Sequence, residues 1–120
     1  IVQSAIENAD KNKQRNHIQN VEFICGDCEK ALPALLQKEK KIDIVLLDPP
    51  RKGCGKGVLD TLIKAAPQKI VYVSCDAATL ARDVKVLAEG GYRAEEAAPF
   101  DMFPQTFHLE CVVFLQRENT

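Results

Sequence analysis

The chain has 120 residues, of which 46% are hydrophobic and 28% charged, and its formal net charge is -1. This composition is typical of one globular domain and excludes a disordered, fibrous or collagen-like protein. The near balance of charge also excludes a generally basic surface for nucleic acid, so any contact with RNA must come from local groups of lysine and arginine.

Membrane insertion and secretion are not indicated by the sequence. The longest apolar runs are too short to cross a bilayer, and the first residues lack the basic segment and cleavage site of a signal peptide. The 5 cysteines are odd in number and scattered, which disfavours a disulfide framework. We therefore expect a cytoplasmic protein with free thiols. Because the chain opens in mid-pattern without Met, we also expect it to be part of a longer protein.

Three elements are predicted in the first third of the chain. A helix is predicted from residue 2, because the apolar side chains of residues 2–9 recur at three- and four-residue intervals, and residues 16–17 end this pattern. Residues 21–25 then predict a β-strand with alternate side chains in the core, and Asp27 follows in the turn after it. Residues 31–36 predict a second helix, with Pro33 in its first turn.

The middle of the chain predicts two strands joined by a helix. Residues 42–48 are nearly all apolar before the terminal Asp48, which is typical of a strand covered on both faces in a parallel sheet. Residues 58–66 show an apolar helical stripe. Residues 69–75 predict a second strand of the same buried type, and this strand ends at Cys75.

A further helix is predicted after Cys75. Asp76 is its expected N-cap and the pair of glycines at 90–91 its stop. Its apolar side is predicted to consist of Leu80, Val84, Leu87 and Ala88.

The alternation of strands and helices predicts the fold class. Two last strands are expected near residues 92–97 and 107–116. The whole pattern indicates a doubly wound, mostly parallel α/β sheet of Rossmann-like type with right-handed crossovers. Ligands of such sheets bind at the carboxyl ends of the strands, and the unusual polar clusters of this chain fall at those places.

The tetrapeptide at residues 48–51, Asp-Pro-Pro-Arg, is the first of these clusters. Its prolines remove backbone donors and stiffen a loop that begins with a carboxylate at a strand end. The motif resembles one of S-adenosylmethionine methyltransferases that act on amino groups or nucleobases. A simple strand stop with a surface aspartate is the structural alternative.

Cys75 is the second candidate. It lies between a buried strand and a helix N-terminus, where unpaired N–H groups and the helix dipole favour a thiolate. An ionised Asp76 would oppose this unless its carboxylate is turned toward the helix amides as a cap. A small buried hydrophobic side chain is the commoner role of a lone cysteine at such a position.

The third candidate precedes and enters the last strand. His108 and Glu110 are expected to share one face of this strand, and burial there would make Glu110 a useful general base or acid. A polar edge face, or a structural His–Glu pair, would explain the same residues. The CxxC spacing of Cys25 and Cys28 stands alone, so we predict no metal site.

Together, three ordered segments resemble signatures of the RNA (uracil-5-)-methyltransferase family. They are residues 48–53, 73–83 and 101–110, and the resemblance extends over essentially the whole chain. It implies a Rossmann-like S-adenosylmethionine methyltransferase fold and an RNA substrate, either transfer or ribosomal RNA. The family usually reads Ser-Cys-Asn-Pro where residues 74–77 read Ser-Cys-Asp-Ala.

The resemblance also implies roles for individual residues. Cys75 matches the family's nucleophile and Glu110 the base that removes a proton, while Asp27 and Asp48 match positions that line the S-adenosylmethionine pocket. This pairing suits the chemistry, because uracil C5 becomes nucleophilic only after a thiolate has added to C6.

Substrate contacts are expected beside the nucleophile. From its location alone, Arg51 is expected to contact a substrate phosphate or the uracil edge, and Pro49 lies in the same loop.

Two features of the family are missing from the sequence. These are a glycine-rich loop after the first strand and an acid after the second. We therefore expect residues 1–120 to be a single domain, the C-terminal part of a catalytic domain that lacks its first two strands. Alone, it should bind S-adenosylmethionine weakly or not at all and be inactive. Its exposed strand edges predict either a closed-up smaller sheet or self-association through those edges.

Two other functions remain open at this point. Methylation of a nucleobase amino group would use residues 48–50 and need no covalent cysteine. A Rossmann-like module that only binds RNA through its lysines would retain RNA without transferring methyl groups.

Overall fold

The computed structural model describes residues 3–38, 41–100 and 110–118. Within these ranges, four strands form one sheet in the order β1-β2-β4-β3. The strands are β1 (Ile44–Leu47), β2 (Lys69–Ser74), β3 (Tyr92–Phe100) and β4 (Glu110–Arg117). The helices are α1 (Gln3–Arg15), α2 (Cys28–Lys38), α3 (Lys56–Ala65) and α4 (Ala77–Glu89).

The strand directions follow from the pairings. β1 and β2 are parallel, whereas β4 is antiparallel to both β2 and β3. Three strands therefore run in one direction, and β4, the last in the chain, is inserted between β2 and β3 with the opposite direction. The predicted α/β class with a mostly parallel sheet is confirmed.

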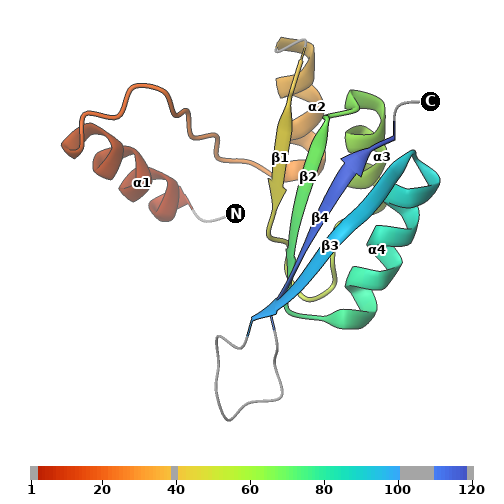
Figure 1. Cartoon of the computed structure of the whole chain (residues 1–120). Coiled ribbons are helices and arrows are strands. Elements are labelled where there is room, and N and C mark those ends of the chain that lie inside the picture. The colour runs from red at the N-terminus through yellow and green to blue at the C-terminus, as the bar shows by residue number, and fades with distance from the viewer. Residues whose placement is uncertain (1–2, 39–40, 101–109, 119–120) are drawn as a thin grey trace.

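Helices α2, α3 and α4 pack on one side of the sheet, as Figure 1 shows. The core lies between these helices and the sheet, where Ile70, Tyr72 and Leu87 are fully buried. Its remaining members are apolar side chains of α3, α4, β3 and β4: Leu59, Leu80, Tyr92, Val113 and Leu115. No helix within the described ranges is long and apolar enough to span a membrane.

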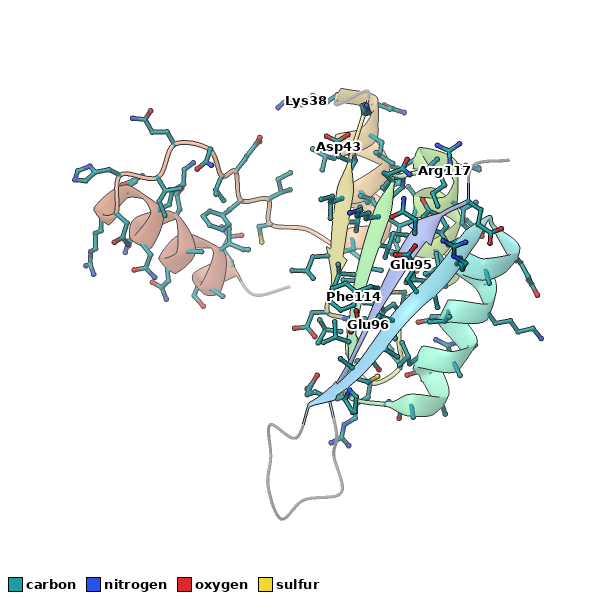
Figure 2. All side chains as sticks on the ribbon, viewed as in Figure 1. Lys38, Asp43, Glu95, Glu96, Phe114 and Arg117 are labelled. Carbon is teal, nitrogen blue, oxygen red and sulfur yellow. The ribbon has the colours of Figure 1, made fainter. Side chains whose placement is uncertain are left out.

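None of the described helices packs on the other side of the sheet. Ile44 and Leu46 of β1 are 62% and 69% exposed, so the prediction that this strand is covered on both faces is wrong. Leu46 pairs with Val71, which pairs with Phe114, and Phe114 is 41% exposed on the same face. Figure 2 shows Phe114 on the side of the sheet away from α2, α3 and α4. Some of the apolar side chains of β1 thus lie on a face of the sheet that no described helix covers.

The N-terminal region departs most from the predictions. Residues 21–25 are described and form no strand, and Val21, Phe23 and Ile24 are 40%, 39% and 47% exposed. A strand needs a neighbour for its backbone hydrogen bonds, and none of the four strands pairs with this segment. The first helix is confirmed as α1, but none of its residues, all of them described, is buried. Figure 1 shows α1 standing apart from the sheet.

The remaining helices agree with prediction except in two details. α2 begins at Cys28, so Pro33 lies inside the helix and not in its first turn. The earlier start follows from Asp27, whose carboxylate accepts a 3.0 Å hydrogen bond from the N–H of Glu29 and caps the helix. In α4, Ala88 is exposed, because the buried side of the helix runs through Leu80 and Leu87.

Candidate active site

The predicted site residues gather at one edge of the sheet. β1 ends at Leu47 and β2 at Ser74, while β4, which runs the other way, begins at Glu110 beside the end of β2. This edge is the lower one in Figure 1. The fold therefore brings Asp48 and Cys75, each the first residue after a strand, to the same edge as Glu110.

The strand register relates Cys75 to Glu110 more closely. Ser74 is the last residue of β2 and pairs with Cys111 of β4. Continued by one residue past this last pair, the antiparallel register would set Cys75, which lies in the bend after β2, opposite Glu110. Opposed residues of an antiparallel pair project to the same face of a sheet. Both side chains are half-buried, so they are partly sheltered from water and still accessible.

The turn around Cys75 is held by Ser74 and Asp76. The Ser74 hydroxyl donates to the carbonyl of Asp76 at 2.9 Å and accepts from its N–H at 3.0 Å. The Asp76 carboxylate accepts a 3.0 Å hydrogen bond from the N–H of Thr79, which confirms the predicted N-cap of α4. The carboxylate is thus turned to the helix amides, the arrangement that a reactive Cys75 requires.

The pKa of Asp76 is lowered from 3.8, chiefly by the hydrogen bond from the backbone of Thr79, with the positive charge of Arg51 as a smaller cause. A lowered pKa in the folded state means that this group stabilises the fold above pH 3.8, and that the stabilisation is lost as the pH falls through the folded-state pKa.

A comparison with Asp76→Asn tests this linkage. Asparagine caps helices about as well as aspartate but does not titrate. We expect the variant's stability, relative to the unsubstituted chain, to improve as the pH falls below 3.8. Denaturant unfolding at neutral and acid pH measures the difference, and a difference that does not change with pH would contradict the expectation.

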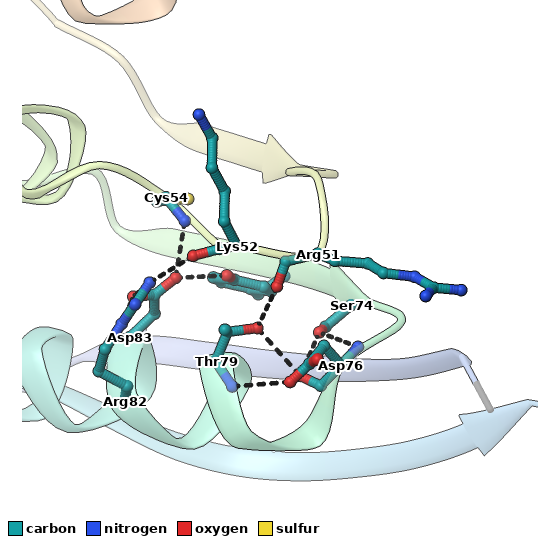
Figure 3. A network of polar contacts seen from close by, with 9 residues as sticks. Arg51, Lys52, Cys54, Ser74, Asp76, Thr79, Arg82 and Asp83 are labelled. Atoms are coloured by element: carbon teal, nitrogen blue, oxygen red, sulfur yellow. Dashed lines mark hydrogen bonds and ion pairs between the residues drawn. The ribbon is translucent and has the colours of Figure 1, made fainter. Parts of the chain in front are cut away.

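Helix α4 also holds the loop that follows β1. The Thr79 hydroxyl donates to the carbonyl oxygen of Arg51 at 2.8 Å, and the guanidinium of Arg82 donates to the carbonyl of Lys52 at 2.7 Å. Figure 3 shows these contacts joining the loop to one face of the helix. Two consecutive carbonyls of the loop are therefore fixed by side chains of one helix.

Asp83 completes this network, and no role was predicted for it. It is fully buried, and its Oδ2 accepts hydrogen bonds from the Cys54 N–H at 2.8 Å and the Tyr72 hydroxyl at 2.5 Å. One signal was present in the sequence: Asp83 lies three residues after Leu80 and four before Leu87, on the buried face of the helix.

The other predicted residues lie around this loop. Asp48 and Arg51 are exposed and Pro49 is half-buried. Asp27 is exposed at the start of α2. The carboxylate of Glu29, two residues further on, lies beside Gly55, so the start of α2 adjoins the same loop.

Among the other cysteines, Cys54 has a thiol with a raised pKa. Burial, followed by the charge of Asp83, raises the pKa of the Cys54 thiol to about 11, which leaves it protonated at neutral pH. Cys25 is half-buried and Cys28 exposed.

Among the described residues, no three His, Cys, Asp or Glu side chains are grouped so as to hold a metal ion. Residues 101–109, with the expected partnership of His108 and Glu110, lie outside the described residues.

This sheet, with its last strand reversed and its polar residues at the carboxyl edge, is a Rossmann-like methyltransferase fold. The M1.HpyAVI–SAM complex is similar with a TM-score of 0.64, over 81% of this chain and 53% of that chain, at 13% identity, a level that shows the fold alone. A Pyrococcus abyssi tRNA (uracil-54, C5)-methyltransferase, solved in complex with S-adenosyl-L-homocysteine, is more similar. Its TM-score is 0.80 at 37% identity, over 95% of this chain and 26% of that chain.

Sequence comparison identifies the family. The family model described as tRNA (Uracil-5-)-methyltransferase matches residues 1–118, and the chain belongs to this family. An uncharacterized RNA methyltransferase of Clostridium tetani is 50% identical over 115 residues, 96% of this chain and 25% of the relative. One from Bacillus cereus is 49% identical over 117 residues, 98% of this chain and again 25% of the relative. The chain thus spans about a quarter of the length of these curated relatives.

Proposed function

We propose that the protein containing this chain methylates C5 of uridine in RNA with S-adenosylmethionine, and that residues 1–120 are the C-terminal part of its catalytic domain. Transfer RNA is the substrate named for the family and for the Pyrococcus abyssi enzyme. The observation that supports the proposal most is the register of β2 and β4, which sets Cys75 opposite Glu110 when extended by one residue. Free thiols and an RNA substrate are both consistent with the cytoplasm.

The proposed mechanism uses Cys75 first. Its thiolate adds to C6 of the uracil, and the electrons of the C5–C6 double bond move so that C5 becomes the carbon of an enolate. S-adenosylmethionine, when bound, supplies an electrophilic methyl group. Cys75 lies two residues before α4, in the turn that the hydrogen bonds of Ser74 and Asp76 hold.

Glu110 acts in the second half of the reaction. Its carboxylate takes the proton from C5, the C5–C6 double bond reforms, and the C6–S bond breaks to release the thiolate of Cys75. Groups on two neighbouring strand ends can reach a flipped-out pyrimidine from different sides, as this sequence of steps requires.

The residues at the edge fit S-adenosylmethionine and RNA by their chemistry. Exposed carboxylates such as Asp48 accept hydrogen bonds from ammonium and ribose hydroxyl groups. Asp27 uses one oxygen for the amide of Glu29 and has a second oxygen that can accept. We assign these two residues to the cofactor, and Arg51 with Pro49 to the substrate, where a guanidinium suits a phosphate or a base edge.

The proposal also includes the behaviour of the chain by itself. It spans about a quarter of its relatives, so we propose that it is inactive alone. β1 ends the sheet on one side and exposes Ile44 and Leu46, and an apolar edge of this kind favours pairing between copies.

Trapping with 5-fluorouridine tests the function. Fluorine at C5 cannot leave as a proton, so the full-length protein incubated with S-adenosylmethionine and fluorinated RNA should form a covalent adduct that survives denaturation. Peptide mapping is expected to find the RNA on Cys75. Methyl transfer without an adduct would instead favour an amino acceptor, and RNA binding without transfer would favour a binding module.

A further inference from the structure

We propose that Asp83 is a positioning residue that keeps the loop after β1 in place beside Cys75. The inference rests on the proposed function, because its purpose is to hold together the groups assigned to that reaction. Asp83 touches neither of the proposed reactive side chains. It acts through the backbone of the loop.

The contacts of Asp83 join three parts of the chain. Its Oδ2 accepts a 2.8 Å hydrogen bond from the N–H of Cys54, which lies in the loop, and a 2.5 Å hydrogen bond from the hydroxyl of Tyr72, which lies on β2. Its Oδ1 accepts a 3.1 Å hydrogen bond from the Nε–H of Arg82, and the same guanidinium donates a hydrogen bond to the carbonyl of Lys52. Burial, and then the hydrogen bond to Asp83, raise the pKa of Tyr72, which therefore stays a donor well into the alkaline range.

A contribution to the stability of the fold does not by itself explain why a carboxylate lies at the buried position of Asp83. Burying a charge is costly, and a well-packed apolar side chain of similar volume often stabilises a core as well or better. The hydrogen bonds of a buried carboxylate do, however, have fixed directions. A fully buried Asp83 that receives a loop N–H therefore defines where the loop lies.

Gly53 shows how closely the loop approaches Asp83. Its φ is 79°, and a Cβ at this position would lie 2.5 Å from Oδ2 of Asp83 and 2.6 Å from a guanidinium nitrogen of Arg82. Any larger residue must therefore push the loop away from α4. The conformation and the close contact both require glycine here.

Helix α4 connects the contacts between Asp83 and the loop to Cys75, the proposed nucleophile. Asp76, next to Cys75, caps the helix, and Asp83 follows seven residues later, about 10 Å along the axis. Between them, Thr79 donates to the carbonyl of Arg51. One rigid helix thus holds both the turn that contains Cys75 and the loop that begins at Asp48, so the spacing between them depends on the contacts at Asp83.

The test measures adduct formation between the full-length protein and 5-fluorouridine RNA in single turnover. Asp83→Ala removes the acceptor of the loop N–H. Gly53→Ala keeps Asp83 and instead sets a methyl group of the loop against Asp83 Oδ2, which displaces the same loop. Tyr72→Phe is the matched control, because it removes the core hydrogen bond to the same oxygen and spares the loop. Loss of folded protein lowers the amount of adduct formed, whereas misplacement lowers its rate constant.

We expect Asp83→Ala and Gly53→Ala each to lower the rate constant about 10- to 100-fold, since a shift of about 1 Å in a site can cost about 100-fold. The double variant should be no slower than the slower single one, and Tyr72→Phe should stay within about threefold of the unsubstituted protein.

Each other outcome has a definite meaning. If folded Asp83→Ala reacts at the unsubstituted rate, or if the two effects simply multiply, the positioning role is wrong while the proposed function stands. Should Asp83→Ala fail to fold, an unsubstituted rate in Gly53→Ala decides against the role. If the unsubstituted protein forms no adduct, the proposed function fails, and the positioning role fails with it.

Discussion

Replacing Cys75 with alanine in the full-length protein is expected to lower uridine methylation by at least about 10⁴-fold, because loss of a covalent nucleophile removes the path by which C5 is activated. Transfer of labelled methyl groups from S-adenosylmethionine to RNA measures the loss. The binding of RNA and of S-adenosylmethionine should be largely retained, since the substitution removes only a half-buried thiol.

Cys28→Ala provides the matched control. Cys28 is an exposed thiol at the start of α2, and its removal should leave the rate unchanged. Substantial methylation by the Cys75 variant would argue against covalent catalysis and in favour of an amino group as the methyl acceptor.

Replacing Glu110 with glutamine is expected to lower turnover about 10²- to 10⁴-fold, the usual contribution of a general base. Glutamine fills the same space but cannot take the C5 proton. The reaction should therefore stop after methyl transfer, with RNA that carries no fluorine, and whose uracil is now methylated at C5, still attached to Cys75. A denaturing gel of labelled RNA would show this complex, which the unsubstituted protein forms only transiently.

Glu95→Gln is the control for this experiment, because Glu95 lies on β3 and pairs with Arg93 at an exposed position. If Glu110→Gln turned over normally, or lost activity without accumulating a complex, another group would have to remove the proton.

Local patterns in the sequence predicted much of the fold. The stripe of α3, the existence of strand β2 and the cap of α4 at Asp76 each depend on residues within a few positions of one another, although only alternate residues of β2 are buried and not both of its faces as predicted. Asp48 and Cys75 were chosen as candidate site residues in the same way, by their positions at strand ends. Their gathering at one edge follows from parallel strands, a general property of such sheets.

The errors arose where structure depends on distant partners. Residues 21–25 have the composition of a strand, yet composition does not supply a neighbouring strand for pairing. The apolar residues of β1 predicted two covered faces, but only one is packed. The role of Asp83 depends on Cys54, 29 positions earlier in the chain, and the stripe of α4 showed only that this carboxylate would be buried.

The burial of Tyr72 and Tyr92 makes the opening of the core observable by absorbance. The chain has no tryptophan and only 2 tyrosines, so tyrosine dominates its near-ultraviolet absorption and emission. Both rings are buried, and the hydroxyl of Tyr92 donates to the carbonyl of Pro67 at 2.6 Å. Burial raises the pKa of each phenol above 10.0, so tyrosinate absorbance in alkali should appear only as the core opens. Above pH 10.0, ionisation of the released phenols in turn favours the unfolded chain.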